Sequence, residues 1–194
     1  MIARGVIGMC VTVALAACSA GAGTGGIVTT YTDYDTLYKP SLYYYVADGR
    51  DVAVNVFGNP TPAPSEAWNL AVTDAMNRSS WVSTGHFTTT PDGSERGNFH
   101  FGLVFGATST MSGKTACTGD VDLGALGPVD GHTAIVGAFC NNTRVVTTAR
   151  VTVNAIGSPD APQLQPAMDQ MLVKLLPRQD PNRPDRFSTP FFLN

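Results

Sequence analysis

The sequence predicts an α+β domain in which a mostly antiparallel sheet carries two helices on one face, as a two-layer sandwich. Several Val- and Thr-rich segments alternate apolar and polar residues with the period of half-buried strands. Two other segments repeat apolar residues at helical spacing. Their order along the chain (strand, helix, several strands, helix) favours helices gathered over one face of a sheet.

A strand and a helix open the predicted domain. Residues 51–57 (DVAVNVF) alternate apolar and polar side chains and predict a strand, which Gly58 and Pro60 end. A helix is expected to begin near Pro64, because proline is tolerated in the first turn of a helix. Its apolar stripe comprises Trp68, Val72, Ala75 and Met76.

Residues 86–105 predict a hairpin whose two strands flank a Pro-Asp-Gly turn. Alternate side chains of its second strand are expected on one face of the sheet, because successive residues of a strand point to opposite faces. These side chains are Phe99, Phe101, Leu103 and Phe105.

Two more strands are expected around Cys117 and Cys140, on either side of the turn-rich loop GALGPVDG. If they pair antiparallel about this loop, the two cysteines face each other and can form a disulfide bond. The alternative is a pair of free or metal-binding thiols. The sequence offers no third nearby thiol and no neighbouring histidine pattern, so the disulfide is favoured.

The last predicted elements are a strand and a helix. Residues 144–155 (RVVTTARVTVNA) follow a turn at Asn141-Asn142 and predict a half-exposed strand. Four of its side chains are expected to point inward: Val145, Ala149, Val151 and Val153. A helix over residues 162–176 has an apolar face and ends at Pro177. That face comprises Leu164, Met168, Met171, Leu172, Leu175 and Leu176.

The N-terminus is typical of a secretory signal peptide. Residues 1–17 contain one charge, Arg4, followed by an uncharged apolar stretch that is too short to span a membrane. The Leu-Ala-Ala-Cys sequence at residues 15–18 resembles the lipobox of bacterial lipoproteins, which implies that Cys18 is acylated, for instance by palmitate, after cleavage. The alternative is an ordinary signal peptide with an incidental cysteine. Residues 18–30, rich in Gly and Ala, are then a flexible tether.

This resemblance implies a lipoprotein of the bacterial cell envelope, anchored in a membrane through Cys18 and facing the periplasm. Ser19, rather than aspartate, resembles the outer-membrane sorting pattern. The phrases GRDVAVNVFGNP, HFTTTP and LPRQDPNR resemble a group of alphaproteobacterial envelope lipoproteins of unknown function. The expected organisation is therefore a signal peptide, the tether, a Tyr-rich lead-in segment, a sandwich domain and a Pro-rich tail, over residues 1–17, 18–30, 31–50, 51–177 and 178–194.

Composition and motifs argue against nucleic acid or nucleotide as a partner. The formal net charge is −3 and no Lys/Arg cluster is present. The segment GATSTMSGKT is reminiscent of a phosphate-binding loop, which needs a glycine five residues before Gly113. That position is Thr108, and Gly106 lies too early, so no cofactor is expected.

The histidines offer one alternative with catalytic or metal chemistry. His86 and His100 lie on opposite arms of the predicted hairpin, where both would point away from the phenylalanine face. A metal site would need a third ligand, and His132 belongs to a distant strand. The alternative function is thus an envelope enzyme whose site is assembled from distant residues such as His86 and His100. The favoured function is a non-enzymatic binding or scaffolding module with an envelope protein as its partner.

All six tyrosines lie in residues 31–45, YTDYDTLYKPSLYYY. Tyrosine is favoured at protein interfaces and at membrane surfaces, but it also packs well. Three roles are therefore open: packing on the sandwich, contact with a partner, or contact with the membrane. Tyr31, Tyr34 and Tyr38 are the candidate partner contacts, and residues 41–46 are a possible edge strand.

Overall fold

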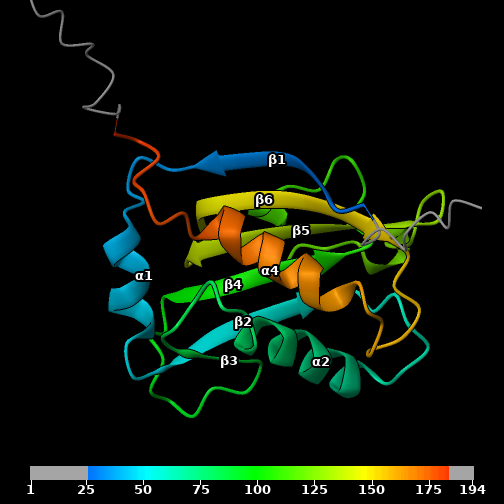
Figure 1. Ribbon diagram of the computed structural model, residues 1–194, viewed down its shortest axis with the longest axis horizontal. Coiled ribbons are helices and arrows are strands. Elements are labelled where there is room, and N and C mark those ends of the chain that lie inside the picture. The colour runs from blue at the N-terminus through cyan, green and yellow to red at the C-terminus, as the bar shows by residue number, and fades with distance from the viewer. Residues whose placement is uncertain (1–25, 184–194) are drawn as a thin grey trace, which may run out of the picture.

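A computed structural model describes residues 26–183 as one six-stranded sheet with helices on both of its faces (Figure 1). The strands, in spatial order, are β1 (Val28–Tyr34), β6 (Arg144–Asn154), β5 (His132–Asn141), β4 (Phe99–Phe105), β2 (Asp51–Phe57) and β3 (His86–Thr88). The helices are α1 (Pro40–Ala47), α2 (Ser65–Asn77), α3 (Gly113–Thr118) and α4 (Leu164–Leu175), with a 3-10 turn at Leu123–Ala125. Cys18 lies outside the described residues, as does the tail beyond residue 183.

The α+β class is confirmed, but the sheet is mixed. Strands β1, β6, β5 and β4 pair antiparallel, whereas β2 pairs parallel with both β4 and β3. The parallel pairs arise because the chain leaves β2, passes through α2 and returns in the same direction. Such a crossover is the usual connection between parallel strands. No helix in the described part of the chain is long and apolar enough to cross a membrane.

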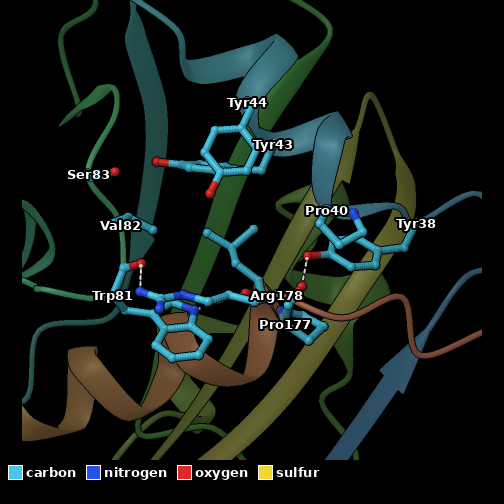
Figure 2. Close-up of a pocket in the computed structure, with 10 residues that line it drawn as sticks. Tyr38, Pro40, Tyr43, Tyr44, Trp81, Val82, Ser83, Pro177 and Arg178 are labelled. Atoms are coloured by element: carbon cyan, nitrogen blue, oxygen red, sulfur yellow. Dashed lines mark hydrogen bonds between the residues drawn. The ribbon is translucent and has the colours of Figure 1, made fainter. Parts of the chain in front are cut away.

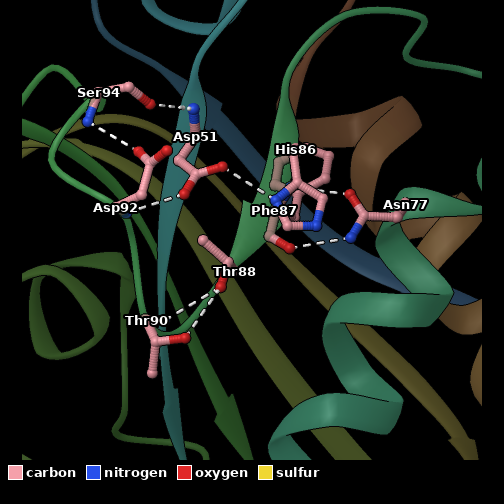
Figure 3. Close-up of polar contacts among 8 residues, drawn as sticks. All are labelled: Asp51, Asn77, His86, Phe87, Thr88, Thr90, Asp92 and Ser94. Atoms are coloured by element: carbon pink, nitrogen blue, oxygen red, sulfur yellow. Dashed lines mark hydrogen bonds and ion pairs between the residues drawn. The ribbon is translucent and has the colours of Figure 1, made fainter.

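The predicted hairpin over residues 86–105 is wrong, because β2 lies between its two strands. One cause is Asn77, at the end of α2. Its side-chain amide accepts a hydrogen bond from the Phe87 N–H (2.8 Å) and donates one to the Phe87 carbonyl (2.9 Å), as Figure 3 shows. This amide occupies the backbone groups of β3 that a further strand would use, so β3 stays a short edge strand.

The larger core lies where α2 and α4 pack on the sheet, in front of it in Figure 1. Both helices and their apolar stripes are confirmed, and every residue of the two predicted stripes is buried. The four residues of β4 expected on one face are buried in this same core. At its centre the ring of Trp68 lies edge-on to Phe105, with 4.9 Å between ring centroids.

The opposite face of the sheet carries α3, so the expected two-layer arrangement is incomplete. The strand predicted around Cys117 is wrong, because residues 113–118 form this helix. Local sequence explains it: the Thr115 hydroxyl accepts a hydrogen bond from the Ser112 N–H at the first turn, and Gly119 ends the helix at a φ of 72°. The predicted Cys117–Cys140 disulfide is confirmed, but it joins a helix to β5 rather than two paired strands.

Strand β6 is present as predicted, with one side chain misplaced. Ala149, Val151 and Val153 are buried in the larger core. Val145 was expected beside them, but the register shifts between Phe139 and Cys140 of β5, and Val145 packs on the face that carries α3. A bulge of this kind moves the next side chain to the other face of the sheet.

The lead-in segment is more regular than expected. Strand β1 begins at Val28, so the last residues of the expected tether belong to the sheet, and β1 runs toward the end of the molecule that carries α1 (Figure 1). Residues 41–46, a possible edge strand, lie in α1 instead. Pro40 favours the first turn of a helix and carries no N–H to leave unpaired there. Residues 178–183 form no helix or strand.

Candidate functional site

Three of the six tyrosines pack inward. The Tyr34 hydroxyl donates to the Lys174 carbonyl (3.1 Å), at the end of α4, and the Tyr38 hydroxyl donates to the Pro177 carbonyl (2.9 Å). The Tyr43 hydroxyl donates to the Thr84 carbonyl (2.7 Å). These bonds attach α1 and the segment before it to the end of α4 and to the chain before β3.

Burial also raises the pKa values of Tyr38 and Tyr43, because the charged phenolate is poorly solvated there. Two of the three tyrosines predicted as partner contacts, Tyr34 and Tyr38, thus support the fold. The third, Tyr31, is exposed on edge strand β1.

Tyr44 and Tyr45 of α1 point outward, with 52% and 54% of their surface exposed. Large aromatic side chains normally bury much of their area, so adjacent exposed tyrosines on a short helix call for a physical reason. Each ring borders a hollow in the surface, and Tyr44 borders two.

The first hollow lies between α1 and the segment after α4 (Figure 2). Its floor is Trp81, whose indole N–H donates to the Leu176 carbonyl (2.9 Å). The Arg178 guanidinium lies 4.2 Å from the centroid of the indole and donates to the Trp81 carbonyl (3.3 Å). The cavity itself measures about 20 Å³. That volume holds a water molecule rather than a ligand. A side chain or loop of a partner could therefore enter this hollow only if the residues that line it rearrange.

The second hollow lies at the other side of Tyr44 and measures about 460 Å³. Its lining is Tyr44, Tyr45, Asp48, Arg50 and Arg96. The Arg96 guanidinium lies 4.2 Å from the centroid of the Tyr45 ring. We call this hollow the arginine pocket.

Both guanidiniums of the arginine pocket have hydrogen-bond donors that no other residue uses in the described part of the chain. The Nε atoms of Arg50 and Arg96 are buried from solvent and have no hydrogen-bond partner. Among residues 26–183, no carboxylate oxygen lies within 4.0 Å of a guanidinium nitrogen of either side chain. Buried polar groups in folded proteins are nearly always paired, so two unpaired guanidinium nitrogens at one hollow are unusual. Both side chains also line the hollow, where their terminal nitrogens can meet a ligand.

Together the two hollows form one surface around α1, which we call the α1 surface. It contains the residue types that dominate binding energy at protein interfaces, namely tyrosine, tryptophan and arginine. Its members are Tyr44, Tyr45, Arg50, Trp81, Arg96 and Arg178. Sequence reasoning identified the tyrosine-rich stretch but missed the other four residues, which come from segments scattered between residues 50 and 178.

The two histidines of the alternative function lie on the same face of the sheet, but β2 separates them. His86 pairs in register with Asp51 of β2, and His100 with Ala53. The His86 Nδ1 atom lies 2.9 Å from an Asp51 carboxylate oxygen. Ser94 is also near Asp51, but its hydroxyl accepts the Asp51 N–H, as Figure 3 shows. The serine hydroxyl thus contacts the backbone of Asp51, and the histidine contacts its carboxylate, so serine and histidine do not meet as they do in a catalytic triad.

His100 lines a shallow groove of about 470 Å³ together with Asn55, Asn69 and Thr118. Burial lowers the pKa of its imidazole, and a hydrogen bond to the backbone of Cys117 opposes this in part. The Nε2 atom is buried and has no partner. The third histidine, His132, lies beside the Asp130 carbonyl at the start of β5 (2.8 Å). The described residues contain no group of three or more His, Cys, Asp or Glu side chains placed to hold a metal ion.

Comparisons with known proteins give a limited result. No protein-family model matches this chain, and no curated protein matches it either. Among solved structures, it is similar to the PelC dodecamer from Paraburkholderia phytofirmans, with a TM-score of 0.40 and 10% identity over 78% of this chain and 98% of that one. A single-substitution variant of the same PelC dodecamer gives a TM-score of 0.39 and 11% identity over the same shares. Similarity at this level carries no conclusion about function.

Proposed function

We propose that this protein is a lipid-anchored envelope protein that acts as a non-enzymatic binding module, with another envelope protein docking on its α1 surface. The observation that carries the proposal is Tyr44, an exposed tyrosine that borders two hollows, each of which contains an arginine stacked on an aromatic ring. Rigid aromatic side chains lose little conformational entropy on binding, so such a surface is well suited to a partner.

The scaffold beneath this surface supports the same proposal. Tyr38 and Tyr43 anchor α1 through buried hydroxyl hydrogen bonds to backbone carbonyls on two other segments. A binding surface is more effective when its residues are held in place before the partner arrives, because less freedom is lost on association. The buried tyrosines thus hold in position the helix on which the exposed ones are presented.

Site-specific photo-crosslinking in the native envelope tests this function. A photoreactive phenylalanine at position 44 should capture one discrete protein partner. The matched control places the same residue at Leu70 of α2, which is 62% exposed but lies outside the α1 surface. Equal products from both positions, or none from position 44, would contradict the proposal.

The same cells test the anchor. Cys18→Ser should move the protein from the membrane fraction to the soluble fraction, because loss of acylation removes the membrane attachment. Retention in the membrane would contradict acylation at Cys18.

A further inference from the structure

We infer that the arginine pocket binds a carboxylate, presented by an acidic side chain or a chain terminus of a protein partner. This inference rests on the proposed function and specifies the chemistry of the docking group. It is carried by the position, pairing and surroundings of Arg50 and Arg96, and it concerns only the arginine pocket of the α1 surface.

The two guanidiniums are the chemical basis of the inference. A guanidinium presents a planar fork of N–H donors that matches the two oxygens of a carboxylate. The Arg96 fork is held by stacking on Tyr45. Both guanidiniums line the hollow, and neither donates a hydrogen bond to another side chain or carbonyl among residues 26–183, so their terminal N–H groups remain available to a bound oxyanion. The Nε atoms behind them are buried and also have no partner.

The charge of the pocket favours a singly charged group. Its lining combines two arginines with one acid, Asp48, so the net charge of the lining is +1. A dianionic phosphate monoester would leave the pocket with a net negative charge, whereas a singly charged carboxylate brings the net charge to zero. Glu95 precedes Arg96 in the chain and has a buried, unpartnered carboxylate oxygen. It lies more than 4.0 Å from both guanidiniums, so it neutralises neither through an ion pair.

The rest of the pocket suits the stem that carries a carboxylate. The rings of Tyr44 and Tyr45 supply an apolar rim, and the 460 Å³ hollow is large enough for a side chain of glutamate size. The docking group is therefore a carboxylate on a short apolar stem.

Titration of the full mature chain, followed by NMR of the arginine Nε–H groups, tests this inference. The probe is N-acetyl-glutamate α-amide, and its neutral counterpart is N-acetyl-glutamine α-amide. We expect the Nε–H signals of Arg50 and Arg96 to shift saturably with the first probe and to stay unchanged with the second. Arg78 is the internal control, because its Nε already donates to Gln165.

Substitution then locates the site. Arg50→Gln and Arg96→Gln should each lower the affinity for the acidic probe by about tenfold or more, since each removes charge-assisted hydrogen bonds. Arg78→Gln, on the surface of α2's C-terminal end, should leave the affinity unchanged. Preserved amide spectra would show that each variant is folded, and the wild-type titration does not depend on any variant.

Several outcomes would overturn the inference. These are no shift with the acidic probe, equal shifts with both probes, stronger binding of inorganic phosphate, or arginine-dependent binding to phosphatidylglycerol vesicles. If crosslinking at Tyr44 succeeds while the titration fails, the proposed function stands and this inference falls. If the titration succeeds and crosslinking fails, the proposed protein partner falls, and with it the part of this inference that names a partner as the source of the carboxylate.

Discussion

At the scale of single residues, neighbouring tyrosines of α1 have opposite roles. Tyr43 is 4% exposed and packs against Phe87 and Phe101, whereas Tyr44 is the exposed residue shared by the two hollows. The residue type is the same at both positions. Their difference arises from the helical period alone, which turns successive side chains by about 100°.

This pair gives a matched stability test. Tyr43→Ala should lower the free energy of unfolding by about 3–5 kcal/mol, the range for truncation of a buried aromatic side chain. Tyr44→Ala should lower it much less, by about 1 kcal/mol at most, because this ring is half exposed and its aromatic contact is edge-on with Tyr43. Urea denaturation measures both values, and similar losses for the two variants would show that Tyr44 is also structural.

His100 predicts a pH dependence of stability. Burial lowers the pKa of its imidazole below the ordinary value of 6.5, so the unfolded chain binds this proton more readily than the folded one. The contribution of His100 to stability is therefore complete above pH 6.5 and is lost as the pH falls below it. In urea denaturation between pH 5 and pH 7, His100→Gln should flatten this slope. Parallel profiles for wild type and His100→Gln would contradict this assignment.

At the scale of elements, α3 depends on a close approach to β4 and on one covalent link. Gly102 of β4 faces this helix, and a Cβ atom there would collide with the Ala116 carbonyl. The disulfide then joins α3 to β5, with 5.6 Å between the Cα atoms of Cys117 and Cys140. Short helices have little stability of their own, so these two features hold α3 on the sheet.

The double substitution Cys117→Ser with Cys140→Ser should lower the free energy of unfolding by about 3 kcal/mol in the chain-entropy model. Amide hydrogen exchange should increase most in α3, because the disulfide is the covalent attachment of this helix to β5. Reduction of the wild-type disulfide should give a similar loss of stability. Exchange that rises equally across the sheet would show that the link stabilises the whole domain instead.

The sequence predicted the elements whose pattern is strong and long. The helix stripes of Trp68 to Met76 and of Leu164 to Leu176, and the alternation in β2 and β6, lead to the right elements because one face of each is buried. The shorter elements were missed for a local reason. Residues 113–118 contain Lys, Cys and two Thr, which show no helical period, and the helix depends on Ser112, Gly119 and the space above Gly102.

At the scale of the whole molecule, the strand order and the α1 surface depend on contacts between segments far apart in the chain, which the sequence pattern does not reveal. The parallel placement of β2 between β3 and β4 requires the α2 crossover and the Asn77 side chain, neither of which produces a periodic signal. Only the tyrosines of the α1 surface could be predicted, because the other residues are brought there by contacts between distant segments. Its tyrosines are contiguous, but Arg96 and Arg178 reach it only through the folded topology.

The direction of β1 determines how far the α1 surface lies from the point where the chain enters the domain. About ten residues separate Cys18 from Val28, an extended span of at most about 35 Å. The chain enters the domain at the start of β1, and β1 carries it about 24 Å toward the end that bears α1 (Figure 1). With Cys18 held in a bilayer, the α1 surface would lie on the far side of the domain from the point of attachment. On the proposal that Cys18 is the anchor, a partner could then reach the docking surface without passing the point of attachment.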